Sequence, residues 1–213
     1  MSSARIAVIC YSSTGHVHRL AQAVAEGAAD DGAAIRLRRV PELAPSAAIE
    51  ANPAWAAHAR ATRDIPEATH DDLRWANGYA FGTPARFGTP AAQLKQFIDT
   101  TSGLWRAGDL TDKPVTVFAS AQNPNGGMEA TLLSLSNVFY HWGSVLVPPG
   151  YTDETTTAAG GNPYGTSYSS NGRGAEIGLA LAAARHQGRR LAQYAVATAG
   201  LRAPDHERVL AAL

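Results

Sequence analysis

The residues best suited to chemistry lie in a short loop near the N-terminus, Ser12-Ser13-Thr14-Gly15-His16-Val17. Its small residues let the backbone approach a bound anion, and its three hydroxyl groups can donate hydrogen bonds to the anion's oxygens. Apolar residues recur at helical spacing after the loop, so a helix N-terminus with unpaired N–H groups should face that anion. Because the loop holds no Lys or Arg, we predict a neutral phosphate site. A plain helix N-cap without a ligand is the alternative.

Two further loops have unusual sequences. Residues 82–90 read Gly-Thr-Pro-Ala-Arg-Phe-Gly-Thr-Pro, and the pair Arg86 and Phe87 could offer a planar cation and an aromatic wall to a flat heterocycle. An ordinary turn with Phe87 in the core is the alternative. Residues 120–127 form a polar loop that ends in two glycines before a predicted helix, which could also be a plain connection.

Two classes of phosphate-binding protein are excluded by these residues. A dinucleotide site needs a G-x-G-x-x-G run after the first strand, and that run is absent. A low-molecular-weight tyrosine phosphatase needs an arginine six residues after its cysteine nucleophile. In this chain the residue six positions after Cys10 is His16. Cys10 lies inside a predicted strand, so we expect a buried, inert thiol.

Strands and helices alternate along the chain in a way that brings the three loops together. The predicted strands cover residues 6–10, 35–37, 79–82, 115–119 and 145–147, and the main predicted helices cover residues 17–32, 90–101, 128–142 and 175–198. This alternation predicts an α/β fold with a parallel sheet. With the first strand central, the order is 2-1-3-4-5, and ligands bind at the carboxyl ends of strands one and three.

Three segments fit this pattern poorly. Residues 41–72 show no clear strand and at most one short helix around 53–63. Residues 151–174 form a long loop rich in Gly, Thr, Ser and Asn, which is usual for a functional segment. We assign residues 1–199 to a single domain and predict a loosely ordered C-terminal tail at 200–213.

The overall composition limits the classes of molecule that the chain is expected to bind. Of 213 residues, 45% are apolar, which is ample for a core. Eighteen basic and eighteen acidic residues give zero net charge, so we expect no nucleic-acid or membrane binding, and little repulsion opposes self-association. A single cysteine and the short polar N-terminus indicate a cytoplasmic protein. The histidines show no metal-binding spacing.

Three sequence motifs in this order are specific in combination. They are Gly-Thr-Pro-Ala-Arg-Phe-Gly at 82–88, Ser-Gly-Leu-Trp at 102–105 and Gly-Asn-Pro-Tyr-Gly at 161–165. Together they closely resemble the WrbA family of flavodoxin-like NAD(P)H:quinone oxidoreductases, and the resemblance runs from about residue 6 to 199. It implies a flavodoxin-like three-layer sandwich with a five-stranded parallel sheet, FMN as cofactor, and NAD(P)H and a quinone as substrates.

The resemblance also implies roles for particular residues. The FMN phosphate would lie on Ser12, Ser13, Thr14, Gly15, His16 and Val17, and the flavin ring would lie along Ala85, Arg86, Phe87, Ser120, Ala121, Gln122, Asn123, Gly126 and His141. Trp105 matches an aromatic residue near the ring face where substrates stack, and we predict catalytic roles for Trp105, Arg86 and His141.

The implied mechanism is ping-pong. NAD(P)H gives a hydride to flavin N5 and leaves, and quinone then accepts two electrons at the same place. The family also implies a homotetramer with shared flavin sites, with a dimer as the smaller possibility.

The chain departs from the family pattern at three places. Its 120–127 loop is one residue longer and poorer in hydroxyl groups, Thr14 stands where many members have Tyr, and Trp142 stands where many have a second His. Two other functions stay open, a flavodoxin-type electron carrier and an FMN-containing regulatory or binding protein.

Overall fold

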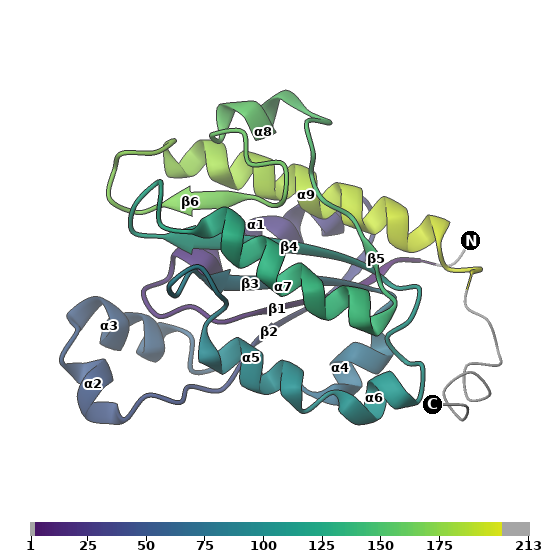
Figure 1. Cartoon of the computed structure of the whole chain (residues 1–213), viewed down its shortest axis with the longest axis horizontal. Helices are drawn as coiled ribbons and strands as arrows, with labels where there is room; N and C mark the ends of the chain where they lie inside the picture. The colour runs from purple at the N-terminus through teal and green to yellow at the C-terminus, as the bar shows by residue number, and fades with distance from the viewer. Residues whose placement is uncertain (1–2, 202–213) are drawn as a thin grey trace.

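The computed structural model describes residues 3–201, and its centre is a parallel sheet (Figure 1). The five strands run in the order β2-β1-β3-β4-β5, and every neighbouring pair is parallel. The predicted fold class and strand order are therefore confirmed. The strands are β1 Arg5–Cys10, β2 Ala34–Arg39, β3 Gly78–Pro84, β4 Pro114–Ala121 and β5 Val145–Leu146.

Helices cover both faces of the sheet and make three layers (Figure 1). Because side chains alternate along a strand, Val8 packs into one core and Ile9 into another. The Val8 core lies under α1 His16–Asp30 and α9 Ile177–Ala197, and the Ile9 core lies under α5 Ala92–Asp99 and α7 Met128–Trp142. The predicted α7 is confirmed at both ends. The predicted helix 90–101 begins too early, because Pro90 precedes the N-cap residue Ala91.

Glycines set the distance between α1 and α9. A Cβ on Gly27 would lie 1.9 Å from the Arg185 carbonyl oxygen, and a Cβ on Gly188 would lie 2.0 Å from that of Val24. Both distances are shorter than any real Cβ contact, so the helices can cross this closely only where side chains are absent. This packing holds α1, whose N-terminus faces the first loop.

The segment 151–174 is not one irregular loop, and that prediction was wrong. It contains α8 Glu154–Ala158 and a sixth strand, β6 Ser167–Ser169. β5 pairs with the start of β4, and β6 pairs with its end at Ala119–Ala121. The sheet therefore has a sixth strand in addition to the predicted five. β5 and β6 pair with the two ends of the same edge of β4, so the insertion between them leaves the middle of that edge without a strand neighbour.

The side chain of Gln187 fills that gap. Its Nε2 donates to the Val117 carbonyl oxygen at 2.7 Å and to the Thr116 hydroxyl, and its Oε1 accepts from the Thr166 N–H at 2.9 Å. Gln187 comes from α9 and is fully buried. Its amide group thus satisfies backbone groups that a continuous fifth strand would have paired.

The segment 41–72 folds into helices at the edge of the sheet. α2 Ser46–Glu50 and α3 Pro53–Ala61 form an arm that projects beside the carboxyl ends of the strands (Figure 1), and α3 matches the predicted short helix. α4 His70–Trp75 follows. A further short helix, α6 Ser102–Arg106, holds Trp105.

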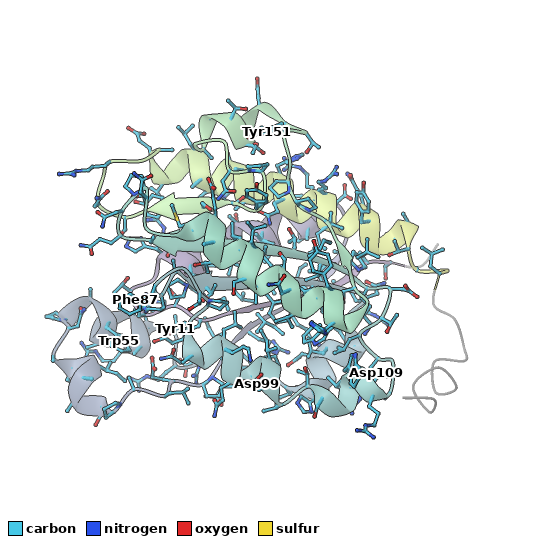
Figure 2. All side chains as sticks on the ribbon, in the orientation of Figure 1. Tyr11, Trp55, Phe87, Asp99, Asp109 and Tyr151 are labelled. Carbon is cyan, nitrogen blue, oxygen red and sulfur yellow. The ribbon has the colours of Figure 1, made fainter. Side chains whose placement is uncertain are left out.

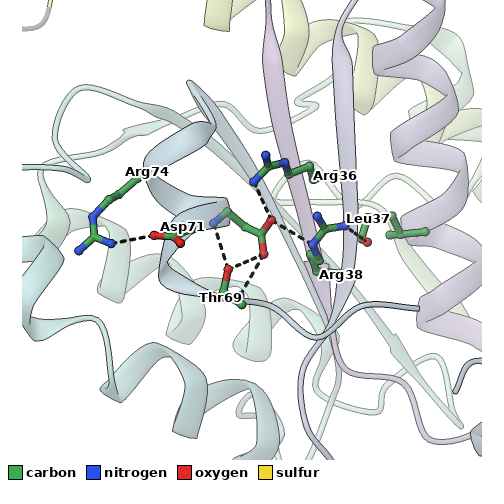
Figure 3. Close-up of polar contacts among 7 residues, drawn as sticks. Arg36, Leu37, Arg38, Thr69, Asp71 and Arg74 are labelled. Atoms are coloured by element: carbon green, nitrogen blue, oxygen red, sulfur yellow. Dashed lines mark hydrogen bonds and ion pairs between the residues drawn. The ribbon is translucent and has the colours of Figure 1, made fainter. Parts of the chain in front are cut away.

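Buried Asp72 connects α4 to β2 (Figure 3). Its carboxylate accepts from Arg36 at 3.1 Å and from Arg38 at 3.0 Å, and it completes a capping box with Thr69. Burial alone would raise the pKa of Asp72, but hydrogen bonds from Arg38 and Thr69 and the charge of Arg38 outweigh it and hold the pKa below its usual value. This network fixes the path of the chain between β2 and β3.

Most of the predicted tail, residues 202–213, lies outside the described residues. The division of the chain at residue 199 stays a prediction. None of the helices within residues 3–201 is long and apolar enough to cross a membrane.

Candidate functional site

A cavity of about 600 Å³ opens at the carboxyl ends of β1, β3 and β4, where the three loops were expected to meet. Predicted residues from each loop line it. They are Ser12, Ser13, Thr14, His16 and Val17 of the first loop, Ala85 and Arg86 of the second, and Ser120, Ala121, Gln122, Asn123 and Gly126 of the third. We call it the main cavity.

The first loop presents an open helix N-terminus. Gly15 is the N-cap of α1 with φ +95°, a conformation that favours glycine, and no described side chain caps the helix. The first turn of α1 contains no acidic residue, and the Gly15 N–H is turned inward onto the Ser12 hydroxyl at 3.1 Å. Within the described residues, the remaining N–H groups of the first turn are therefore free for an anion, which the positive end of the helix dipole also favours.

Arg86 adds a positive charge to this loop, which is neutral in sequence. Its Nη2 donates to the Ser13 hydroxyl at 3.2 Å, although the two residues are 73 positions apart. An oxyanion at the loop would therefore meet backbone N–H groups, hydroxyls and one guanidinium.

The second loop ends in a tight turn that exposes Phe87. Arg86 and Thr89 exchange backbone hydrogen bonds of 2.9 and 3.0 Å around Phe87 and Gly88, whose φ angles are +52° and +78°. Both angles match a type I′ turn, in which a bulky residue at the first position is strained. The Phe87 side chain is fully exposed (its position is labelled in Figure 2). Phe87 is not among the residues that line the main cavity. The reading of Phe87 as a core residue is therefore wrong.

The third loop is held by the residues that directly follow β6. Ser170 N donates to the Ala121 carbonyl oxygen at 2.9 Å, and the Asn171 side chain donates to Asn123 Oδ1 at 2.7 Å. Ser170 also lines the main cavity. Ser120 and Ala121 belong to the end of β4, so only the residues after them form the loop. The segment beyond β6 was expected to be irregular, so it gave no signal that it would shape the site.

His16 lines the main cavity. Its ring lies 5.3 Å from that of Tyr168, and its Nδ1 is buried without a hydrogen-bond partner within residues 3–201. Burial, followed by the nearby charge of Arg19, lowers the pKa of His16, so the ring is neutral at neutral pH. A neutral ring adds no charge for an anion, so the backbone N–H groups and Arg86 supply the attraction.

Sequence reasoning missed two residues on the rim of the main cavity, Asn52 and Trp55. Asn52 Oδ1 caps α3 by accepting from the N–H groups of Ala54 and Trp55 at 3.2 Å. Little in the sequence points to them, because residues 41–72 show no clear strand and the short helix expected around 53–63 could not be placed relative to the three loops.

Trp105 and His141 are placed together, but away from the main cavity. The Trp105 indole N–H donates to the His141 carbonyl oxygen at 2.8 Å, and both residues border a shallow cavity of about 350 Å³. His141 lies 13 residues along α7 from Met128, which follows the third loop, so about 20 Å of helix separates it from the site. Figure 1 shows α6 and the end of α7 on the side opposite the arm.

Two other expectations concern Cys10 and metals. Cys10 is buried in β1, and burial raises the pKa of its thiol to about 12, so it is not a nucleophile at neutral pH. No group of three or more His, Cys, Asp or Glu side chains in the described part of the chain could hold a metal ion.

A family model described as NADPH-dependent FMN reductase matches residues 4–156. The chain belongs to this family. An NAD(P)H dehydrogenase (quinone) of Deinococcus radiodurans is 47% identical over 169 residues, which cover 79% of this chain and 84% of that protein. One of Geobacter sulfurreducens is 41% identical over 203 residues, 89% of this chain and 97% of that protein.

Among solved structures, a flavodoxin, WrbA-like protein from Agrobacterium tumefaciens is 27% identical, with a TM-score of 0.66 over 92% of this chain and 99% of that one. The resemblance to WrbA proteins inferred from the three motifs is thus confirmed. Family membership also fits a fold in which three loops form one cavity at the carboxyl ends of β1, β3 and β4.

Proposed function

We propose that this chain is an NAD(P)H dehydrogenase that reduces quinones with FMN as its cofactor. The observation that carries the proposal is the main cavity, where an uncapped helix N-terminus, three hydroxyl groups and Arg86 meet. Its family and its quinone-reducing relatives support the same activity.

The residues present fit FMN. The phosphate would lie on Ser12–Val17 at the N-terminus of α1, and the flavin ring would lie along Ala85–Phe87 and the loop after β4. When bound, FMN supplies the redox chemistry, taking a hydride from NAD(P)H at N5 and giving two electrons to quinone.

The protein's own residues would hold the cofactor in place and stabilise negative charge that develops during the reaction. Thr14 and the first turn of α1 anchor the phosphate end, and the turn at 86–89 fixes the position of Arg86. The guanidinium is a permanent, preorganised donor, so it stabilises negative charge that develops beside it. His141 of a neighbouring chain would supply a second donor.

Titration of the FMN-free protein tests the cofactor. We expect FMN to bind more tightly than FAD, because the open N-terminus of α1 and Arg86 attract the doubly charged terminal phosphate of FMN more strongly than the singly charged phosphodiester of FAD. Equal or tighter FAD binding would contradict the proposal. In Arg86→Ala, the FMN dissociation constant should rise about ten-fold or more from loss of a charged hydrogen bond. Arg185→Ala, which removes an exposed arginine paired with Glu26, is the control.

We also propose ping-pong kinetics, because NAD(P)H and quinone would use the same cavity in turn. Initial rates measured at several fixed quinone concentrations should give parallel double-reciprocal lines. Intersecting lines would show that both substrates bind together and would contradict a shared site.

We further propose a homotetramer in which each site is completed by another chain. Within one chain, Trp105 and His141 are too far from the main cavity to take part, whereas a neighbour's pair could reach it. Exposed Phe87, Leu133 and Tyr140 provide apolar surface for such contacts. Light scattering over a dilution series, compared with activity, tests this. A fully active monomer would contradict it. A cytoplasmic location stays a prediction.

A further inference from the structure

A histidine of the arm, His58 of α3, packs against the loop to which the proposed function assigns the FMN phosphate. A Cβ on Gly15 would lie 3.4 Å from His58 Nδ1. Gly15 is the N-cap of α1, so the imidazole stands beside the residue that begins the anion-binding turn. Nothing in the proposed function so far uses this side chain.

Glu42 fixes the arm beside the first loop. Its carboxylate accepts from the Trp55 indole N–H at 3.2 Å, from the Tyr11 hydroxyl at 2.8 Å and from the Gln93 amide at 2.7 Å. These donors come from α3, from the residue after β1 and from α5, and two of them are labelled in Figure 2. His58 follows Trp55 by three residues on the same side of α3, so its position is fixed as well.

Three histidines gather around the N-terminus of α1. The rings of His58 and His18 lie 5.6 Å apart, and both line a cavity of about 150 Å³ that we call the small cavity. Ser12 of the first loop lines the small cavity and the main one, and His16 lines the main one. His58 does not line the main cavity, so it would act on an anion there through its charge and not by contact.

The histidine rings respond to charge at this place. Burial lowers the pKa of all three, and the neighbouring rings of His18 and then His16 lower the pKa of His58 further. A positive neighbour therefore disfavours the protonated ring of His58. An anion bound at the N-terminus of α1 would have the opposite effect and would raise the pKa of His58.

Other charged groups face His58 across the small cavity. Arg39 at the end of β2 and Arg63 after α3 oppose a positive charge on the ring, although Arg39 is paired with Glu67 at 2.9 Å. Burial would raise the pKa of Glu42, but its hydrogen bonds outweigh burial and lower the pKa, so an ionised carboxylate favours that charge. His58 also lies in the last turn of α3, where the helix dipole favours a cation. Because these effects oppose one another, an added phosphate would decide whether the ring is protonated.

We propose that His58 is a positioning residue of the phosphate site, which takes up a proton from solvent as the FMN phosphate binds and attracts that phosphate as an imidazolium. This inference rests on the proposed function and adds a group from the arm to its phosphate site. In the imidazolium both nitrogens carry a hydrogen, including the Nδ1 that faces Gly15.

The sign of the pH dependence follows from linkage. A ligand that raises the pKa of a group binds more tightly wherever that group is protonated in the complex. His58 should therefore strengthen FMN binding at mildly acidic pH. Its contribution should disappear as the pH rises through the pKa of His58 in the complex.

FMN dissociation constants of His58→Gln and of the unmodified protein, measured by flavin fluorescence, test this. Their ratio should be about one near pH 8 and rise to about five near pH 6, because the glutamine cannot become charged. The FMN phosphate itself titrates in this range, but that effect is common to both proteins and cancels in the ratio. His70→Gln is the control and should give a ratio near one at both pH values. His70 bonds to the Thr100 hydroxyl at 2.9 Å and begins α4, away from the arm (Figure 1).

Two further measurements separate charge from structure. Riboflavin lacks the phosphate, so its dissociation constant should not differ between His58→Gln and the unmodified protein at either pH. Calorimetric titration with FMN near pH 6.5, in two buffers with different heats of ionisation, should show that the unmodified protein takes up more protons than His58→Gln. His58→Lys is charged at every pH in this range, so near pH 8 it should bind FMN more tightly than the unmodified protein.

A ratio for FMN that does not change with pH, equal proton uptake by the two proteins, or the same pH-dependent ratio for riboflavin would overturn the inference. Weaker FMN binding in His58→Lys near pH 8 would also count against it. If the unmodified protein bound no FMN at any pH, the proposed function itself would fail.

Discussion

At the scale of single residues, the clearest sign of function is a conformation that the folded chain does not need for its own stability. Phe87 has a positive φ and a fully exposed ring, which together cost energy and contribute nothing to the core. Strained residues of this kind persist where the surroundings or a ligand repay them. The proposed site offers two partners for this ring, FMN and a neighbouring chain.

Replacing Phe87 with Asn should therefore have opposite effects on stability and binding. Asn adopts positive φ readily, so the free energy of unfolding of the FMN-free protein should rise by about 0.5–1 kcal/mol in urea titrations. FMN affinity should fall, because the aromatic contact is lost. Phe87→Tyr is the matched control and should leave both quantities nearly unchanged. A loss of stability in Phe87→Asn would mean that the ring packs within the chain.

At the scale of elements, single buried polar side chains replace missing backbone contacts. Gln187 of α9 connects β4 to the segment before β6 and closes the gap between β5 and β6. Asp72 of α4 connects that helix to β2. Both side chains hold elements that border the site, because β6 anchors the third loop and β2 leads to the arm.

Gln187→Leu should destabilise the protein strongly. The leucine fills similar space but leaves the Val117 carbonyl and the Thr166 N–H buried without partners, at about 1–3 kcal/mol for each group. Chemical denaturation should show this loss. Gln193→Leu on the exposed side of the same helix should change stability by less than about 0.5 kcal/mol. Equal effects in the two variants would contradict the bridging role.

Asp72→Asn should cost about 3 kcal/mol, because it leaves Arg36 and Arg38 without their buried partner. Asp71→Asn is the matched control. Asp71 is exposed on the same helix and pairs with Arg74 at 3.0 Å (Figure 3), so its loss should cost less than about 1 kcal/mol.

The lowered pKa of Asp72 also predicts how the effect of Asp72→Asn on stability depends on pH. The pKa of Asp72 in the folded protein is below its usual value, so its contribution is complete above the usual aspartate pKa and is lost as the pH falls through the folded-state value. The stability difference between Asp72→Asn and the unmodified protein should shrink in that acidic range. A difference that stays constant down to low pH would contradict the role of the ionised carboxylate.

At the scale of the whole molecule, the candidate residues fall into two groups at opposite ends of the sheet. The loops and Arg86 line the main cavity, while Trp105 and His141 lie beside the far end of α7. A chain acting alone would leave the second group unused. Assembly allows one chain's Trp105 and His141 to complete another chain's cavity.

Mixing two impaired variants tests this arrangement. Arg86→Ala damages the cavity and His141→Ala damages the surface that would complete a neighbour, so each homotetramer should have low activity. When the two chains are unfolded together and reassembled, about a quarter of the sites should combine an intact cavity with an intact neighbour. Activity should then exceed the mean of the two parents. A mixture that matches this mean would contradict shared sites.

The alternation of apolar runs and amphipathic helices in the sequence was sufficient to predict the strand order of the sheet, the bounds of α7 and the three loops of the site. Those features depend on short-range periodicity and on glycines that permit particular turns, such as Gly15 at the start of α1. The carboxyl ends of parallel strands share one edge, so the meeting place of the loops followed from the strand order alone.

Contacts between distant segments could be decided only by the folded structure. Arg86 reaches Ser13 across 73 positions, Glu42 holds Trp55 through a carboxylate shared by separate elements, and Gln187 replaces part of a strand. A strand as short as β6 carries too little periodicity to be recognised, and it forms because β4 offers it a pairing edge. The positions of Trp105 and His141 are of the same kind, because the direction in which α7 runs across the sheet, which no local pattern encodes, carries them away from the cavity.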